Sequence, residues 1–294
     1  MQPEISEFSY GFALTNEVVG WVELFAAPIF PSLVEEGKAG GGYDVKLDQP
    51  GAPLYLQFKR SECMVTRRAK EFKSVKSQGH ELHVPFYRFP ITEAKKSDQH
   101  ELLLALDQVP DNHVYYAAPR FHRLREINDA WTSSEVASRS IFIAPRDIGP
   151  LDDGNHRIAF DSTDTWLCSD PQSVAAFNSR EVLERIRATL KEEKRPLRQR
   201  LPNLVAELQE AERRGRERID ENRRRAEEVT PDLYDIDHYL VEEDERAIIA
   251  LPEPDPPQLR DPKPLPPELN SLRKASDIAA RVFDAQLIIV QPQN

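Results

Sequence analysis

Two neighbouring stretches decide the expected fold: Gly40-Gly41-Gly42-Tyr43-Asp44-Val45, and then Leu54-Tyr55-Leu56-Gln57-Phe58-Lys59. Between them, Asp48-Gln49-Pro50-Gly51 places proline and glycine where turns favour them. The pattern predicts two short adjacent strands, 43–47 and 54–59, joined as a hairpin.

The predicted hairpin would bring Asp44, Gln57 and Lys59 together. Strand side chains alternate between faces, so Gln57 and Lys59 share a face while Phe58 points the other way, into the core. Metal-assisted hydrolysis of a phosphodiester needs hard oxygen ligands, and it benefits from a cation beside the developing negative charge. A hairpin of this kind would supply both. The alternative reading of Asp44 is a strand-end carboxylate with no role.

The glycine run before Asp44 and the later Gln-x-Lys resemble the core of the PD-(D/E)XK nuclease superfamily, in particular its Mrr-like restriction endonuclease branch. The resemblance implies that Asp44 binds Mg²⁺ (or Mn²⁺) and that Gln57 replaces the usual second acid as a ligand or orienter. It implies that Lys59 positions water or stabilises charge. Two departures are that Tyr43, not proline, precedes Asp44, and that Gln57 lacks the charge of a glutamate.

The resemblance spans about residues 7–119 and implies two further groups. One is a glutamate on the preceding helix that would join Asp44 and Gln57 as a metal ligand; Glu17 is the first choice and Glu7 the second. The other is a glutamine on the helix after the third strand, a role that Gln99 could fill.

The rest of the first 175 residues alternates between helical and strand patterns. We therefore expect an α/β fold, a restriction-endonuclease-like mixed sheet flanked by helices with a helical C-terminal extension. The expected helices cover residues 6–25, 97–106 and 124–136, and the expected further strands cover 84–91, 112–118, 140–143 and 156–160.

The character of the sequence changes after Pro171. Residues 179–190 and 203–229 are dense in Glu and Arg with sparse apolar positions, which predicts a long exposed helix or a coiled-coil arm. Eight prolines among the sixteen residues 252–267 predict an extended linker. A helix, 271–283, and an apolar strand, 286–290, follow, and such a strand must pair with the core sheet or a partner. The expected units are 1–175, 176–250 and 251–294.

Charge is distributed unevenly over the chain. The net charge is −11, yet seven basic and only two acidic residues lie between Lys59 and Lys76. This run either follows a phosphate backbone or solvates a helix. Its position directly after the Gln-x-Lys favours DNA contact modestly, and the expected DNA-binding residues are Arg60, Arg67, Arg68 and Lys70.

Two cysteines are too few for a disulfide framework, and the acidic N-terminus does not resemble a signal peptide, so we expect a cytoplasmic protein without a membrane span. The function expected first is a metal-dependent DNA endonuclease in prokaryotic defence against foreign DNA. The alternative is a catalytically weak or inactive scaffold or DNA-binding subunit of a larger complex. A protein partner or homo-oligomer contact is expected through the C-terminal helices and tail.

Overall fold

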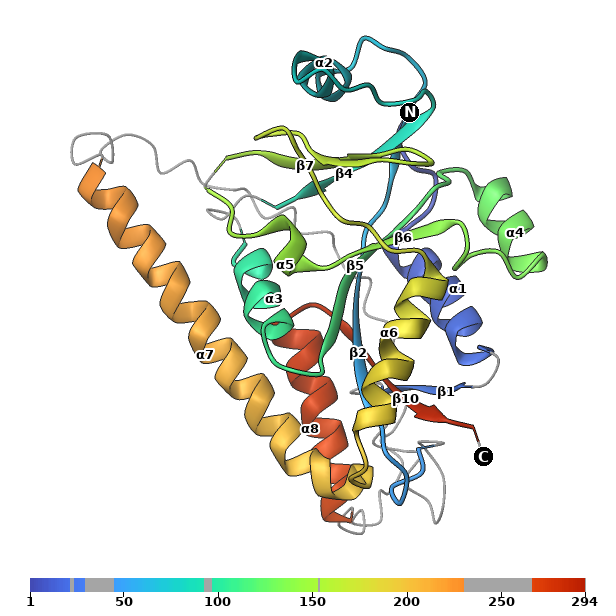
Figure 1. The fold of residues 1–294 in the computed structure, drawn as a ribbon, viewed down its shortest axis with the longest axis vertical. Helices are drawn as coiled ribbons and strands as arrows, with labels where there is room; N and C mark the ends of the chain where they lie inside the picture. Colours follow the sequence, from blue (N-terminus) through green and yellow to red (C-terminus); the bar gives the residue numbers. More distant parts are fainter. Residues whose placement is uncertain (22–23, 30–44, 93–96, 153, 230–265, 294) are drawn as a thin grey trace, which may run out of the picture.

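The computed structural model describes residues 1–21, 24–29, 45–92, 97–152, 154–229 and 266–293. Within these ranges the chain forms two five-stranded sheets with helices around them (Figure 1). The expected architecture, a mixed sheet flanked by helices with a C-terminal helical extension, is confirmed.

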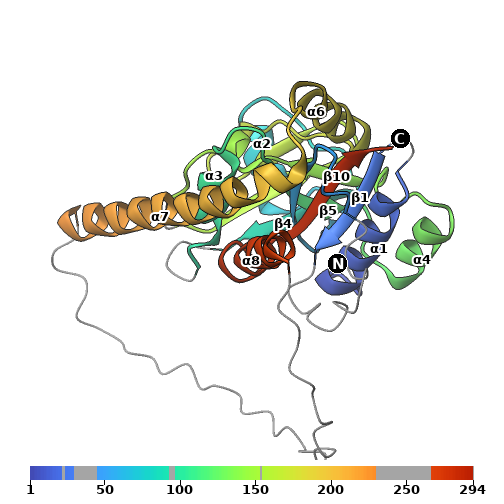
Figure 2. The same cartoon turned by 90° about the horizontal axis from the view of Figure 1, so that it is seen from below.

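The first sheet has the order β1-β10-β2-β5-β6. Neighbouring strands are antiparallel except β2 and β5, which are parallel. The last strand of the chain therefore lies inside the sheet, between β1 and β2. Figure 2 shows β10 beside β1. The strands are β1 (Leu24–Ile29), β2 (Ala52–Phe58), β5 (His113–Pro119), β6 (Ser140–Ile143) and β10 (Gln286–Pro292).

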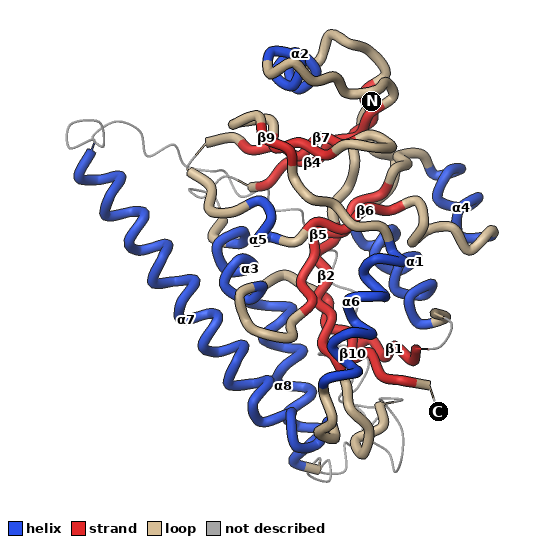
Figure 3. Tube along the Cα trace, in the orientation of Figure 1, coloured by secondary structure: helices blue, strands red, loops and turns tan. Residues whose placement is uncertain are grey.

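Alternation along β2 builds two apolar layers, one on each face of this sheet. Leu54 and Leu56 pack with residues of α1, α4 and α6, whereas Tyr55 packs with residues of α3, α7 and α8. The sheet is thus sandwiched between two sets of helices (Figures 1 and 3). The helices are α1 (Glu7–Val19), α3 (Gln99–Asp107), α4 (Leu124–Thr132), α6 (Ser179–Glu192), α7 (Leu197–Val229) and α8 (Pro267–Val282).

The second sheet is antiparallel throughout, with the order β3-β4-β7-β8-β9. Phe89, Ile158 and Phe160 on one of its faces join the main hydrophobic cluster, and α2 packs against Phe86 and neighbouring residues. The remaining elements are β3 (Glu62–Met64), β4 (Phe86–Ile91), β7 (His156–Phe160), β8 (Thr165–Leu167), β9 (Gln172–Ser173), α2 (Lys70–Ser77) and α5 (Pro145–Ile148).

The predicted hairpin is wrong. Residues 45–47 form no strand, and β2 has β10 and β5 as its neighbours instead. Lys46 is held at the end of β10, where its backbone N–H donates to Gln291 Oε1 at 2.8 Å and its carbonyl accepts from Gln291 Nε2 at 2.9 Å. Residues 43 and 44 lie outside the described ranges. A turn occurs close to the predicted one, since Gln49 N–H donates to Lys46 O at 3.1 Å, but the distant strand β10 lies where the hairpin partner was expected.

Two helix predictions also need correction. The first helix ends at Val19, not Phe25, because Gly20 ends it and Leu24 already begins β1. The charged arm is not a free helix. α7 buries Leu201, Leu204 and Leu208 in the main cluster, and Gly215 lets α7 approach α3 so closely that a Cβ there would lie 2.8 Å from Leu102.

The tail helix and strand were predicted correctly as elements. The tail strand was expected to pair either with the core sheet or with a partner. It pairs with the core sheet, because β10 has β1 and β2 along its two edges. None of the helices in the described ranges is long and apolar enough to cross a membrane.

Candidate functional site: a polar cleft at the end of β2

An open cleft of about 370 Å³ lies where β2 ends. Segments far apart in the chain meet there: the start of α1, the end of β2, the start of α3 and the connection between α8 and β10. Its polar and charged lining includes Glu7, Gln57, Lys59, Arg60, Glu62, Gln99 and Asp284. The cleft therefore gathers acids, amides and cations on the face of the sheet that α3 and α8 cover.

Lys59 lies at the base of this cleft with only 7% of its surface exposed. Its backbone N–H donates to Ala117 O at 2.9 Å, which continues the pairing of β2 with β5 beyond Phe58. Its Nζ donates to Gln99 Oε1 at 3.2 Å and lies 5.6 Å from the ring centre of Tyr116. Burial lowers the pKa of Lys59, while the carboxylates of Glu7 and Asp284 act in the opposite direction without restoring it.

Gln57, Gln99 and Asp284 form a hydrogen-bonded group beside this lysine. Asp284 Oδ2 accepts from Gln99 Nε2 at 2.6 Å and from Gln57 Nε2 at 3.2 Å. Gln57 is 3% exposed, and its Oε1 has no hydrogen-bond partner among the described residues. A buried acceptor without a partner is unfavourable, so this oxygen is a candidate ligand atom for a cation.

The structure brings together Gln57, Lys59 and Gln99 as predicted, and Phe58 points to the opposite face. There the Phe58 ring meets Tyr10 edge-on at 6.0 Å and lies so close to Gly11 that a Cβ at Gly11 would be 2.7 Å from it. The alternation of β2 therefore separates an apolar anchor from the polar pair, as the sequence indicates.

Glu17, the first choice for a glutamate ligand on the preceding helix, does not line the cleft. Its Oε2 instead accepts a hydrogen bond from the backbone N–H of Val136 at 2.7 Å. Glu7 does line the cleft. Ten residues of helix separate the two acids by roughly 15 Å along the axis, so only one of them can reach Lys59. The second choice, Glu7, is therefore the acid that the structure places there.

Asp44, the acid that the resemblance makes the principal ligand, lies outside the described residues. Asp284, by contrast, is not among the residues predicted from the sequence, although its side chain contacts both glutamines of the cleft. No local signal marks it, because an isolated aspartate between a helix and a strand is common in turns. Only the insertion of β10 beside β2 brings it to this position.

The expected DNA-binding residues are all exposed, but they do not form one group. Arg60 lines the cleft. Arg67 pairs with Glu81 at 3.3 Å, and Arg68 and Lys70 follow on the segment that leads from β3 into α2. The basic run therefore extends away from the cleft over the second sheet.

A second group with metal-ligand chemistry consists of His83, Asp161 and Asp164, whose ligand atoms lie within 4.8 Å of one another. Asp161 already accepts hydrogen bonds from the backbone N–H groups of His83 at 2.6 Å, Thr163 at 2.8 Å and Asp164 at 2.9 Å. Burial would raise the pKa of Asp161, but these backbone hydrogen bonds lower it. This carboxylate stabilises the loops around it.

No protein-family model matches the chain, and no curated protein or solved structure matches it.

Proposed function

We propose that the chain is a metal-dependent nuclease that hydrolyses phosphodiester bonds in DNA. The observation that supports this best is Lys59, a buried ammonium group in a polar cleft. Burial lowers the pKa of this lysine. A lysine with a perturbed pKa in a cleft is a candidate functional group, because structural lysines are rarely buried without a full ion pair. Around it lie the carboxylates of Glu7, Glu62 and Asp284 and the oxygen of Gln57, which has no hydrogen-bond partner among the described residues.

The donor set of the cleft fits a hard divalent cation such as Mg²⁺ or Mn²⁺. Gln57 and the carboxylates that line the cleft would supply oxygen ligands, the type that these ions prefer. When bound, such an ion polarises a phosphoryl oxygen and lowers the pKa of a bound water. Lys59 would stabilise the negative charge that develops on the phosphate, with Gln99 and the Tyr116 ring holding its ammonium group in place.

DNA would reach the cleft from the side of Arg60 and extend along the segment that carries Arg68 and Lys70. The resemblance of the Gln-x-Lys stretch to Mrr-like restriction endonucleases supports a role in prokaryotic defence against foreign DNA, in the cytoplasm. We include both as parts of the proposal.

The test is cleavage of supercoiled, linear and single-stranded DNA by the full chain with Mg²⁺ or Mn²⁺. We expect metal-dependent cleavage that a chelator stops and that Lys59→Met reduces by at least about 100-fold, as expected for removal of a group that stabilises transition-state charge. Lys191→Met is the matched control, because Lys191 is exposed on α6, which packs on the opposite face of the sheet. Equal cleavage by wild type and Lys59→Met, or none by the wild type, would contradict the proposal.

A second candidate function is that of a scaffold or DNA-binding subunit with little or no catalysis. It is favoured by an exposed apolar surface on α1, where 84% of Phe8 and 57% of Phe12 are exposed and Phe12 meets Trp131 of α4 edge-on at 6.2 Å. Because β10 is paired on both edges within the chain, a partner would meet this surface or the exposed side of α7 more readily than the tail strand.

The two candidates separate in a cellular assay. A scaffold keeps its cellular function in Lys59→Met and loses it when Phe8 and Phe12 are both changed to Ser. A nuclease loses its cellular function in Lys59→Met. DNA affinity that persists without metal, with no strand breaks, would favour the DNA-binding subunit.

A further inference from the structure

The carboxylate of Asp284 lines the cleft although Asp284 is 227 positions from Gln57 in the chain. Gln99 Nε2 donates to its Oδ2 at 2.6 Å, and Gln57 Nε2 donates to the same oxygen at 3.2 Å. Its negative charge also acts on Lys59. One aspartate from the end of the chain thus contacts both amides of the cleft and influences its lysine.

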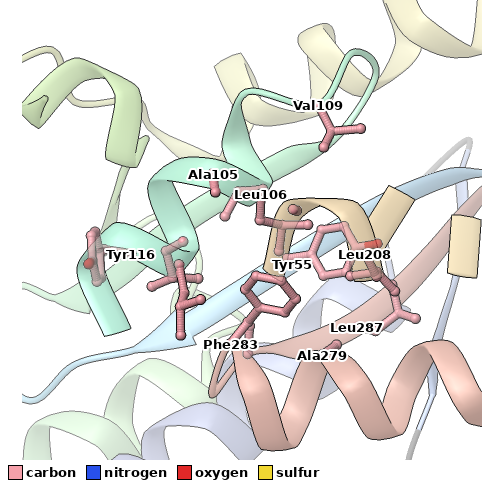
Figure 4. Packing of buried hydrophobic residues seen from close by; sticks show 14 of the residues in the cluster. Tyr55, Ala105, Leu106, Val109, Tyr116, Leu208, Ala279, Phe283 and Leu287 are labelled. Carbon is pink, nitrogen blue, oxygen red and sulfur yellow. The ribbon is translucent and has the colours of Figure 1, made fainter. Parts of the chain in front are cut away.

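The fold holds Asp284 at this position by strand register and by packing. β10 runs antiparallel to β2 with Gln286 opposite Leu56, so the chain just before Gln286 reaches the level of the last residues of β2. The preceding residue, Phe283, is fully buried among Tyr55, Leu106 and Leu287 (Figure 4). Asp284 itself has φ +48°, a left-handed conformation that Asp and Asn adopt more readily than most residues.

The partners of Asp284 are groups that can turn away from it. Both are side-chain amides, and rotating the Gln57 amide by half a turn would exchange its nitrogen for the oxygen that now has no partner. The contrast with Asp161 is clear, because Asp161 is held by backbone N–H groups that cannot rotate away. A cation beside Asp284 would therefore gain the Gln57 oxygen, a buried atom in a residue that is 3% exposed.

We propose that Asp284 is the principal carboxylate ligand of a divalent cation in this cleft, with Gln57 as its neighbouring oxygen ligand. This inference rests on the proposed metal-dependent function, and it assigns the principal acid to the connection between α8 and β10 instead of to Asp44. The C-terminal segment is then part of the site and not an appendage to it.

The test measures Mn²⁺ binding to the full chain without DNA, by titration with Mn²⁺ and detection of the free ion by electron paramagnetic resonance. We expect saturable binding by the wild type and at least a tenfold weaker affinity for Asp284→Asn. Asp277→Asn is the matched control, because Asp277 lies on α8 and pairs with Arg281 at 2.7 Å away from the cleft. Its affinity should equal that of the wild type.

Asparagine keeps the size of the side chain and tolerates the left-handed backbone, so Asp284→Asn should fold. Asp284→Gly, which also tolerates this backbone, is a second variant that should lose the same affinity. Unchanged Mn²⁺ affinity in a folded variant, or no saturable binding by the wild type, would overturn the inference.

The outcomes also separate this inference from the proposed function. Mn²⁺ binding that depends on Asp284, without DNA cleavage by the wild type, would remove the nuclease function and keep the ligand assignment. Metal-dependent cleavage that Asp284→Asn leaves unchanged, together with unchanged Mn²⁺ affinity, would remove the assignment and keep the nuclease function.

Discussion

Lys59 and Arg88 are two cations in neighbouring parts of the molecule, and their surroundings differ. Arg88 on β4 donates from Nε to Glu62 at 2.7 Å and from Nη1 to Glu71 at 2.5 Å. Lys59 at the end of β2 donates from Nζ to the neutral amide of Gln99 at 3.2 Å. One cation has two directly bonded carboxylates, whereas the other has an amide and more distant charges.

The pKa values of the two groups shift in opposite directions for this reason. Burial alone would lower the pKa of Arg88, but the hydrogen bonds and charges of Glu62 and Glu71 raise it above its ordinary value. For Lys59, burial lowers the pKa, and Glu7 and Asp284 do not compensate. The difference indicates that Arg88 stabilises the fold, whereas the fold holds Lys59 in an environment that does not stabilise its charge. Such an environment is typical of functional groups.

The largest effect of a single substitution is expected from breaking the Arg88 network. Arg88→Met leaves Glu71, which is 5% exposed, with its negative charge poorly compensated. We expect the free energy of unfolding to fall by about 3 kcal/mol, as is usual when one partner of a buried ion pair is removed. Urea denaturation at neutral pH measures it. A loss below about 1 kcal/mol would mean that the pairs with Glu62 and Glu71 do not differ in kind from surface salt bridges.

A comparable loss of stability is expected at acidic pH. Two histidines, His100 and His113, are buried as Lys59 is, and burial disfavours the charged form of each group. Burial lowers the pKa of His100, which bonds Tyr116 behind Lys59, from 6.5 to about 4, and burial likewise lowers the pKa of His113 to about 4. Between pH 6.5 and about pH 4, the folded state therefore binds fewer protons than the unfolded state. Stability is therefore full above about pH 6.5 and falls as the pH drops toward 4, by up to about 3 kcal/mol for each histidine.

The measurement is the free energy of unfolding in urea at pH 7 and at successive lower values. Replacing His100 and His113 together with Gln should flatten the slope between pH 6.5 and 4. An unchanged slope in that double variant would assign the acid sensitivity to other groups.

The smallest effect is expected from the exposed cations. Arg67 is paired with Glu81, whereas Lys70 at the start of α2 is an exposed cation in the part of the chain that the structure describes. If DNA follows this surface, Lys70→Gln should lower DNA affinity and reduce the slope of log K against log salt by about 1, with a smaller change for Arg67→Gln. Fluorescence anisotropy at several salt concentrations measures both. Equal slopes for both variants and the wild type would place the DNA elsewhere.

The parts of the fold that depend on local pattern were predictable, because side-chain periodicity is a property of the sequence itself. The strand 140–143 and the strand 156–160 were predicted with their observed bounds, and the alternation in β2 placed Gln57 and Lys59 on one face. Helix α7 was identified, but its burial was underestimated, because three leucines at helical spacing and a glycine at the crossing suffice to pack it against α3.

The parts that depend on tertiary arrangement were not predictable. Glu7 and Glu17 lie on one helix, and only the packing of α1 beside Val136 decides which of them reaches the cleft. The position of Asp284 depends on β10 inserting between β1 and β2, a pairing between opposite ends of the chain. A turn does occur near the predicted position, at residues 46–49, but a turn does not determine which strand pairs with β2.

We infer that Lys59 is held in the cleft for a purpose other than stability, and the free energy of unfolding of Lys59→Met at neutral pH tests this inference most directly. Methionine keeps much of the apolar stem and removes the buried charge, while the hydrogen bond to Gln99 is lost. We expect a stability equal to or above that of the wild type, in contrast to the loss in Arg88→Met. A loss of about 2 kcal/mol or more would show that Lys59, like Arg88, stabilises the fold, and would contradict this inference.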